Sequence, residues 1–508
     1  MLQRALRATL VWKHPHATSI MIRSNDGSNP SSSAKICVPV CVTDLSVLRT
    51  VEPADFIELR LDYLEREPEN LAEVLHKISG PVILTFRPSE QGGHRQLTRE
   101  ARLNFWNNVA PRGERIWWDI EGDLAHELSP DWSRVIISHH DFNGVPDDLH
   151  DIYQRLAATP AHVVKIAFQA HDIIDCIPAF ELLFRARRDG HEIIPIAMGN
   201  AGIATRVLGP SQGAFLTYGS LDDENATAPG QVTARNLREL YRVSEIDKDT
   251  VVCGLIGLPV MHSVSPQIHN GWFASERLNG VYLPFEVRDV HSFVRRMVRP
   301  RTRELNWNLR GLSVTAPHKQ AVMEHLDWID PKAIEIGAVN TITVDADRLL
   351  GYNTDAPGFT DPLFKKFESL EGRRAAVIGA GGAARAAIWA LRQQKAEVTI
   401  FTRNVPKAQP LAESFSVNCE PLASATFGDY DLVVNTTPLG SGAFIDQSPV
   451  TAEQLYGVRI AYDLIYNPAD TRFLREARKA ECDAIGGLEM LVAQAKIQFE
   501  LWTGRKVD

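Results

Sequence analysis

The amino-acid sequence predicts an α/β protein in which a (β/α)8 TIM barrel precedes a two-domain unit that contains a Rossmann domain. Three observations lead to this fold class. The chain has 508 residues, which exceeds the roughly 250 to 300 residues at which a single core stops growing. Eight short apolar runs alternate with helix-like stretches between residues 36 and 218. Farther along, a glycine-rich turn joins a strand pattern to a helix pattern within residues 373–404.

The eight apolar runs account for the barrel prediction. Helix-like periodicity fills intervals between them, as in NLAEVLHKI and IPAFELLFRARR. Strands that alternate with helices favour a parallel sheet, and eight of them favour its closure into a barrel. In chain order the runs are ICVPVC, DFIELR, PVILTF, RIWWDI, RVIIS, HVVKIAF, EIIPIA and GAFLTY.

A polar connector, SEIDKDT, separates the barrel from a new strand-like run, VVCGLIG. Domain boundaries are expected in such polar segments, where few contacts cross. The sequence therefore predicts a flexible N-terminal extension (1–35), the barrel (36–243), a linker (244–250), a substrate-binding domain (251–360) completed by a C-terminal helix (484–505), and a Rossmann domain that binds NADP (361–483).

The composition indicates which kind of molecule the protein binds and in which cellular compartment it is expected. The formal net charge of −9 argues against a nucleic-acid-binding protein, and no run approaches the about 18 apolar residues of a membrane span. We therefore expect small-molecule substrates and leave the oligomeric state open. Six cysteines without a CxxC pair favour a reducing compartment. The bacterial cytosol is the expected location, with organelle targeting by residues 1–35 as the alternative.

Polar residues gather where the barrel runs end, and the active sites of TIM barrels lie at the carboxyl ends of their strands. Two arginines, a histidine and a lysine in these places point to chemistry and not to packing alone. The residues are Arg60, Asp62, Arg87, Glu121, His140, Lys165 and Met198.

Lys165 is the candidate nucleophile of the barrel. An amine can catalyse elimination beta to a ketone by forming an imine, because the protonated imine acidifies the neighbouring carbon. The flanks of Lys165 are apolar, which favours its neutral form.

His140 is the candidate base, and His139 competes with it because strand alternation lets only one of the two imidazoles point into the barrel. Glu58 is placed to orient that imidazole. Arg60, Arg87 and Arg206 supply bidentate donors for a hydroxylated carboxylic acid.

Seven segments of the first half resemble type I 3-dehydroquinate dehydratase across residues 36–231. They are IELRLDYL, TFRPSEQGG, WWDIEGD, IISHHDF, VVKIAF, AMGNAGIATR and ATAPGQV. The resemblance implies that Lys165 forms a Schiff base and that His140 is the general acid/base, with Glu58 behind it. It also implies that Arg206 holds the substrate carboxylate and that the pocket is lined by Arg60, Arg87, Thr227 and Gln231.

The segment RRAAVIGAGGAARAAIWALRQQKAEVTIFTRN reads as strand, glycine turn, helix and strand, which is a dinucleotide-binding pattern. Gly379 allows the tight turn, and Gly381 lets the backbone approach a pyrophosphate. After the second strand an NAD site would carry an acid, whereas this chain has basic residues there, so NADP is the expected cofactor. The expected cofactor-binding residues are Gly379, Ala380, Gly381, Gly382, Ala383, Thr402, Arg403, Asn404, Lys407, Thr436 and Gly487.

Lys319 and Asp355 are the candidate catalytic pair of the second half. Hydride transfer to or from a carbinol needs a group that exchanges the hydroxyl proton. Both residues lie in turn-like contexts, VTAPHK and YNTDAPG, that would hold a side chain at a cleft.

Nine segments of the second half resemble shikimate dehydrogenase over residues 251 to about 503. They are GLPVMHSVSPQIHN, VTAPHK, IGAVNTI, GYNTD, GAGGAAR, FTRN, VNTTPLG, DLIYNP and GGLEMLVAQA. The resemblance implies that Lys319 and Asp355 are catalytic and that no metal is required. It implies as well that Ser263 and Ser265 bind the substrate carboxylate, while hydroxyl groups contact Thr315, Asn340, Tyr466 and Gln494.

Together the two halves predict a bifunctional enzyme of the shikimate pathway. The first half would dehydrate 3-dehydroquinate, and the second would reduce the product, 3-dehydroshikimate, with NADPH. A catabolic quinate or shikimate oxidoreductase and a non-catalytic regulator that responds to quinate are the alternatives. The regulator is disfavoured because the chain keeps Lys165, His140, Lys319 and Asp355.

Overall fold

The structure, a computed structural model, describes residues 34–41, 54–64, 71–76, 78–222 and 230–508. They belong to two compact units, Arg23–Leu309 and Arg310–Asp508, which we call the N-terminal and C-terminal units. This division falls inside the range 251–360 that the sequence predicts as one domain, so the domain boundaries stay a prediction. Nearly all of the expected extension 1–35 lies outside the described residues.

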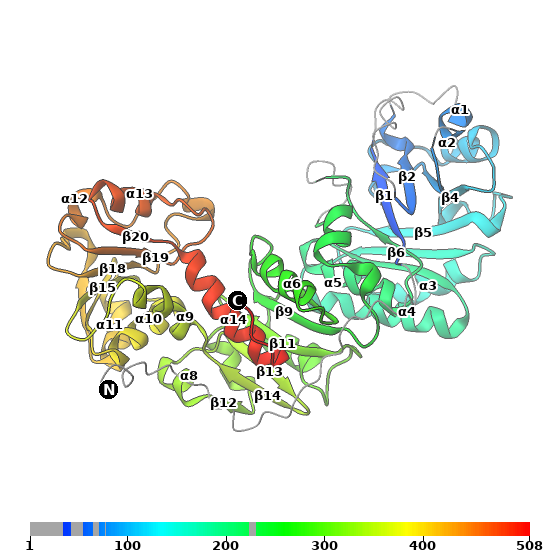
Figure 1. Cartoon of the computed structure of the whole chain (residues 1–508). Coiled ribbons are helices and arrows are strands. Elements are labelled where there is room, and N and C mark those ends of the chain that lie inside the picture. Colours follow the sequence, from blue (N-terminus) through cyan, green and yellow to red (C-terminus); the bar gives the residue numbers. More distant parts are fainter. Residues whose placement is uncertain (1–33, 42–53, 65–70, 77, 223–229) are drawn as a thin grey trace. The chain divides into compact units, whose positions relative to one another are not determined.

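Eight parallel strands form a barrel in the N-terminal unit, in the order β7-β6-β5-β4-β3-β2-β1-β8 (Figure 1). Each strand coincides with or overlaps one of the eight apolar runs, so the barrel prediction is confirmed. The strands are β1 Ile36–Val40, β2 Phe56–Arg60, β3 Val82–Thr85, β4 Ile116–Glu121, β5 Val135–Asp141, β6 Val163–Gln169, β7 Glu192–Met198 and β8 Thr217–Tyr218.

The last strand, β8, is short, and the segment before it helps to close the barrel. β8 pairs with β1, while the backbone N–H of Phe215 donates to the carbonyl of Ile193 on β7 at 2.9 Å. Apolar side chains such as Phe56, Trp117 and Ile136 fill the barrel interior. The interior is therefore a packed core, as in other barrels of this size.

The helices of the barrel follow from the amphipathic stretches between the runs. They are α1 Leu71–His76, α2 Arg99–Asn104, α3 Leu149–Ala157, α4 Cys176–Asp189 and α5 Ile203–Leu208. Helix α4 ends where Gly190 adopts a left-handed conformation with φ 82°, which glycine reaches without steric cost.

The N-terminal unit continues beyond the barrel with two parallel strands, β9 Val251–Gly257 and β10 Gly280–Glu286, and the helices α6 Ser265–Ser275 and α7 Val290–Phe293. This segment is bonded directly to the barrel. Directly after β10, the backbone N–H of Arg288 donates to Asp172 at 2.6 Å, and its Nε donates to the carbonyl of His171 at 2.7 Å. The loop after β6, the strand of Lys165, thus contacts the second half of the sequence.

The C-terminal unit contains a mixed sheet in the order β11-β13-β14-β12. Its elements are β11 Leu309–Val314, β12 Trp328–Ile329, α8 Pro331–Ile336, β13 Thr341–Asp345, β14 Arg348–Tyr352 and α9 Asp355–Phe364. The C-terminal helix, α14 Gly487–Thr503, packs on α9 and β13. Its Trp502 is fully buried and donates from Nε1 to the carbonyl of Ile342 at 3.0 Å.

The rest of the C-terminal unit is a doubly wound parallel sheet with the order β17-β16-β15-β18-β19-β20, which is the strand order of a Rossmann domain. Apolar clusters cover both faces of this sheet, so its central strands β15, β16, β18 and β19 are largely buried. The elements are β15 Arg374–Ile378, α10 Gly382–Gln393, β16 Glu397–Thr402, α11 Val405–Phe415, β17 Asn418–Pro421, β18 Leu432–Asn435, α12 Ala452–Leu455, β19 Ile460–Asp463, α13 Arg472–Lys479 and β20 Asp483–Ile485.

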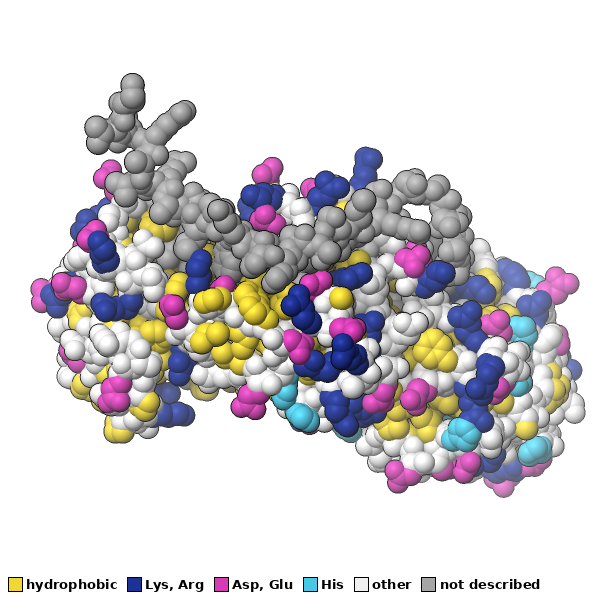
Figure 2. Space-filling model, turned by 90° about the horizontal axis from the view of Figure 1, so that it is seen from below, with side chains coloured by type: hydrophobic (Ala, Val, Ile, Leu, Met, Phe, Trp, Pro, Cys, Tyr) yellow, Lys and Arg dark blue, Asp and Glu magenta, His cyan; other side chains and the backbone are white. Residues whose placement is uncertain are grey.

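None of the helices in the described part of the chain is long and apolar enough to span a membrane. Basic and acidic side chains are interspersed on the face shown in Figure 2, and histidines lie among them. This mixed pattern accompanies the negative net charge of −9.

Candidate active sites

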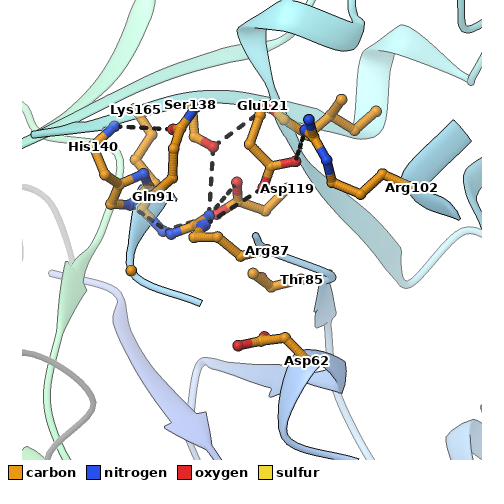
Figure 3. Close-up of polar contacts among 12 residues, drawn as sticks. Asp62, Thr85, Arg87, Gln91, Arg102, Asp119, Glu121, Ser138, His140 and Lys165 are labelled. Carbon is orange, nitrogen blue, oxygen red and sulfur yellow. Dashed lines mark hydrogen bonds and ion pairs between the residues drawn. The ribbon is translucent and has the colours of Figure 1, made fainter. Parts of the chain in front are cut away.

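The barrel interior turns from apolar to polar toward the carboxyl ends of its strands. Side chains two residues apart on a strand share one face, so Asp119 and Glu121 both point inward from β4, as Figure 3 shows. Ser138 and His140 of β5 are related in the same way. All four are buried, with exposed fractions of 8% or less, so the charged members among them need partners inside the protein.

Lys165 lies at the centre of this polar layer, with 3% of its surface exposed. Its Nζ donates to Asp119 Oδ2 at 2.8 Å and to the hydroxyl of Tyr218 at 3.0 Å, and it lies 3.6 Å from Glu58 Oε1. The strand neighbours of Lys165 are apolar, as the sequence suggests, but the amine itself is surrounded by carboxylates. The amine of Lys165 is thus an ion-pair partner of two buried carboxylates, Asp119 and Glu58.

Glu58 forms no hydrogen bond with the imidazole of His140 in this structure, so its expected role in orienting that imidazole stays a prediction. Its carboxylate accepts a hydrogen bond from Thr85 Oγ1 at 2.7 Å and lies beside Lys165. Strand alternation was read correctly, since Glu58 points inward with 3% exposure. The arrangement of the strands in the barrel, which was not predicted residue by residue from the sequence, places Glu58 beside the amine of Lys165.

His140, and not His139, faces the pocket. Its Nε2 lies 2.6 Å from Arg87 Nη1, and its backbone N–H donates to Gln91 Oε1 at 3.2 Å. Burial lowers the pKa of His140 well below its ordinary value, and the nearby charges of Arg87 and Lys165 lower it further. The imidazole is therefore neutral near pH 7 and able to accept a proton.

Asp119 joins the two cations of the site. It accepts from Lys165, and its Oδ1 lies 2.7 Å from Arg87 Nη2. Burial alone would raise the pKa of Asp119, but the charges of Arg87 and Lys165 hold it well below its usual range. Asp119 is thus an ionised carboxylate in a fully buried position.

The three expected arginines differ in their partners. Arg60 is bonded to Asp62 through two hydrogen bonds of 2.9 and 2.8 Å, and Arg87 is paired with Asp119. Arg206 has no carboxylate partner among the described residues and donates only to the carbonyl of Tyr218 at 3.5 Å. Burial lowers its pKa to about 10. A buried cation without an anion is costly, so Arg206 marks a place for an anionic ligand.

One pocket brings most of the expected barrel residues together: Glu58, Arg60, Arg87, His140, Lys165, Arg206 and Gln231 all line it. Thr227 lies outside the described residues. Sequence reasoning missed Tyr218 and Gln91, which also line the pocket, and Asp119. Alternation within RIWWDIEGD could have identified Asp119 as an inward neighbour of Glu121, whereas Tyr218 and Gln91 depend on long-range pairing.

The glycine turn of the Rossmann domain is shaped to admit a ligand close to its backbone. Gly379 has φ 113°, and a Cβ there would lie 2.6 Å from Thr436 Oγ1. At Gly381 a Cβ would meet no atom within 4 Å, so open space lies beside the N-terminus of α10. Free N–H groups at such a terminus bind pyrophosphate. The turn, which includes Ala380, Gly382 and Ala383, therefore fits a dinucleotide.

The end of β16 supplies the charge that a 2′-phosphate requires. Arg403 and Lys407 are exposed, and neither forms an ion pair with another described residue. Asn404 caps α11 by accepting from the backbone N–H of Lys407 at 3.0 Å, and its own N–H donates to Thr402 Oγ1 at 3.2 Å. The capped turn thus holds two cations beside the expected ribose position, which fits NADP.

Lys319 and Asp355 are brought together by the fold of the C-terminal unit. Lys319 Nζ donates to Asp355 Oδ2 at 2.6 Å, and Asn340 Nδ2 donates to Asp355 Oδ1 at 2.7 Å. The side chain of Lys319 is 18% exposed, and its Cδ would lie 3.5 Å from a Cβ on Gly382. The pair therefore lies next to the glycine turn that is expected to bind the cofactor.

Most of the remaining expected residues lie near strand ends or at helix starts, and Gln494 lies in the middle of α14. In the N-terminal unit, Ser263 Oγ donates to Ser265 Oγ at 3.0 Å at the start of α6. In the C-terminal unit, Gln494 of α14 contacts Asn340 at 3.4 Å. Thr315 follows β11, Tyr466 follows β19, Thr436 follows β18 and Gly487 begins α14. Among the residues described, no cluster of three or more His, Cys, Asp or Glu is arranged to hold a metal.

Family models match successive parts of the chain. Type I 3-dehydroquinase matches residues 36–248, and the shikimate dehydrogenase substrate binding domain matches residues 255–342. Shikimate / quinate 5-dehydrogenase matches residues 363–445, and the shikimate 5'-dehydrogenase C-terminal domain matches residues 487–508. The two resemblances stated from the sequence are thus confirmed.

Three similar proteins cover either the whole chain or its second half. A shikimate dehydrogenase (NADP(+)) of Caldanaerobacter subterraneus is 41% identical and covers 52% of this chain and 95% of its own length. A solved shikimate 5-dehydrogenase of Thermus thermophilus, in complex with NADP(H) and shikimate, is 38% identical over 51% of this chain and 95% of its own, with a TM-score of 0.46. The chloroplastic bifunctional 3-dehydroquinate dehydratase/shikimate dehydrogenase of Arabidopsis thaliana is 32% identical over 99% of this chain and 87% of its own. The chain therefore belongs to the family of bifunctional 3-dehydroquinate dehydratase/shikimate dehydrogenases.

Proposed function

We propose that this chain catalyses two consecutive reactions: the barrel dehydrates 3-dehydroquinate to 3-dehydroshikimate, and the second half reduces 3-dehydroshikimate to shikimate with NADPH. The convergence of Lys165, His140 and Arg206 in one buried pocket carries the proposal. These three side chains are the nucleophile, the base and the anion anchor that an imine-based elimination from a carboxylic acid requires.

The dehydration begins at the amine of Lys165. The amine attacks the substrate ketone, and the carbonyl oxygen leaves as water, which forms a protonated imine. The imine nitrogen carries the same positive charge as the ammonium group that Asp119 faces at 2.8 Å. The buried carboxylate thus stays paired with a cation when the covalent bond forms, and no uncompensated charge is left inside the barrel.

His140 moves the proton of the elimination. Because its imidazole is neutral, it accepts the proton from the carbon next to the imine and then returns that proton to the leaving hydroxyl, which departs as water. Hydrolysis of the imine releases the product and restores the amine. The net change is the loss of one water molecule from the substrate.

Arg206 is proposed to hold the carboxylate of the substrate. It is the buried arginine of the pocket that lacks an acidic partner in the described part of the chain, so a ligand carboxylate would complete its pairing. Arg60 and Arg87, already paired with Asp62 and Asp119, would instead donate to the ring hydroxyls from fixed positions.

The second half is proposed to transfer a proton through Lys319. A bound NADPH supplies the hydride. Lys319, bonded to Asp355 at 2.6 Å, lies where it can give a proton to the oxygen of the reduced carbonyl. Asp355 keeps the amine oriented and is itself held by Asn340. Arg403 and Lys407 would bind the 2′-phosphate.

Borohydride reduction in the presence of 3-dehydroquinate tests the imine. We expect a stable mass increase within residues 36–248, because reduction converts the imine into an amine that does not hydrolyse. Lys165→Ala should abolish the increase, and Lys248→Ala, at an exposed position, should leave it unchanged. Mass captured by the Lys165→Ala protein would show that another residue forms the imine.

Arg206→Met should separate substrate binding from stability. Loss of a buried charge partner costs about 2–5 kcal/mol of binding, so KM for 3-dehydroquinate should rise about 30-fold or more. Removal of an unpaired buried charge should raise the free energy of unfolding by about 1 kcal/mol or more. Steady-state kinetics and thermal unfolding measure the two effects. Arg188→Met, at a 76% exposed side chain, is the control; a lower stability of Arg206→Met together with an unchanged KM would contradict the assignment.

The double variant Arg403→Ser/Lys407→Ser tests the cofactor site. KM for NADPH should rise about tenfold or more, since charge-assisted bonds to the phosphate contribute about 1.5–3 kcal/mol, and KM for NADH should stay the same. The exposed Lys395, paired with Glu371, gives a control in Lys395→Ser. An equal rise in KM for NADPH and for NADH would mean that Arg403 and Lys407 do not bind the 2′-phosphate.

A further inference from the structure

Two charged residues that do not line the barrel pocket lie directly behind it. Glu121 ends β4 and is fully buried, and Arg102 of α2 is 6% exposed. Arg102 Nη1 donates to Glu121 Oε2 at 3.2 Å, and the same guanidinium makes two hydrogen bonds to Asp123, of 3.0 and 2.7 Å. Figure 3 shows Glu121 between Arg102 and Arg87. Glu121 Oε1 lies 3.5 Å from Arg87 Nε.

Arg87 is held on two sides by acids and presents its third side to the base. Asp119 faces its Nη2 at 2.7 Å, Glu121 faces its Nε, and Nη1 lies 2.6 Å from His140 Nε2. An arginine can only donate hydrogen bonds, so Nε2 of His140 must be the acceptor. The neutral imidazole therefore carries its proton on Nδ1, and the lone pair of Nε2 accepts the hydrogen bond from Arg87.

We propose that Arg102 and Glu121 are positioning residues of the dehydratase: Arg102 fixes Glu121, Glu121 orients the guanidinium of Arg87, and Arg87 keeps the proton of His140 off Nε2. This inference rests on the proposed dehydratase function of the barrel. Neither Arg102 nor Glu121 is among the residues that line the pocket, so both act through Arg87 and not on the substrate.

Glu121 is suited to this task because its two cationic partners do not change charge during turnover. Asp119 also holds Arg87, but it is shared with Lys165, whose nitrogen becomes part of the covalent intermediate in the proposed mechanism. Glu121 faces Arg87 and Arg102, and arginine stays protonated in proteins. Its hold on Arg87 is thus the same before and after the imine forms.

The charge of Glu121 depends on Arg102. The pKa of Glu121 is raised to about 7, mainly by burial and also by Asp119, although Arg87 and Arg102 lower it. These are the charged groups that face Glu121, from the end of β3, from α2 and from β4 itself. Loss of the Arg102 charge would raise the pKa further, so that Glu121 would be protonated, and unable to pair with Arg87 as an anion, at neutral pH.

The test compares Arg102→Met with Arg99→Met in the full-length chain. Arg99 lies on the same helix and faces Asp123 and Glu127 instead of Glu121. For Arg102→Met we expect the dehydratase kcat at neutral pH to fall about tenfold or more, with KM within about threefold, because the ground-state contacts of the pocket remain. The acid limb of its pH–rate profile should move to higher pH, since Glu121 must be ionised to hold Arg87. Arg102→Lys, which keeps the charge, should restore most of the rate, and Arg99→Met should behave as wild type.

Glu121→Gln keeps the experiment decisive if Arg102→Met does not fold. An amide cannot be ionised, so raising the pH should recover the rate of Arg102→Met but not that of Glu121→Gln. In the Glu121→Gln background, Arg102→Met should cause no further loss, because the two residues act through one contact.

Three results would overturn the inference: an unshifted acid limb in Arg102→Met, an equal loss in Arg99→Met, or additive losses in the double variant. Each of these requires a wild-type chain that dehydrates 3-dehydroquinate. A wild-type chain without that activity would instead contradict the proposed function itself, so the two failures are distinguishable. Borohydride capture at Lys165 in each variant shows that the pocket is intact.

Discussion

A single buried carboxylate, Asp119, holds both the amine of Lys165 and the guanidinium of Arg87. The rest of the barrel site follows from this arrangement. Because two cations in an apolar barrel would repel each other and resist burial, the acid between them makes the cluster possible. Its geometry then directs Lys165 toward the pocket and Arg87 toward His140, while Arg206 is left to bind an anion. The site is therefore preorganised by charge pairing before any substrate arrives.

The second half uses the same physical principle with fewer charges. Lys319 and Asp355 form one close pair, and neutral amides complete it through Asn340. This site is more exposed than the barrel site, with side-chain exposures of 18% and 10% for the pair, so solvent exchanges protons there more readily. The difference in exposure thus separates a buried site for covalent catalysis from a more open site for proton exchange with an alcohol.

Local sequence patterns predicted the strands, the glycine turn and most pocket residues. Strand alternation and turn formation depend on residues that are close together in the sequence, so these features can be predicted from it. They did not decide between His139 and His140, and the structure shows that His140 lines the pocket. They placed Glu58 beside the imidazole, although it lies beside Lys165. Asp119 and Tyr218 were missed as partners of the amine, since those contacts join residues 46 and 53 positions apart. The sequence alone did not predict which side chains of different strands meet, and these contacts determine which charged groups of the site pair with one another.

The central claim, that one chain performs both reactions in succession, is tested most directly by a coupled assay. Purified full-length protein is given 3-dehydroquinate and NADPH, with no other enzyme, and the NADPH absorbance is followed. The account predicts a steady loss of NADPH after a short lag, as 3-dehydroshikimate forms in the barrel and is reduced in the second half. Constant absorbance, in a preparation that oxidises NADPH when given 3-dehydroshikimate directly, would contradict the assignment of the barrel.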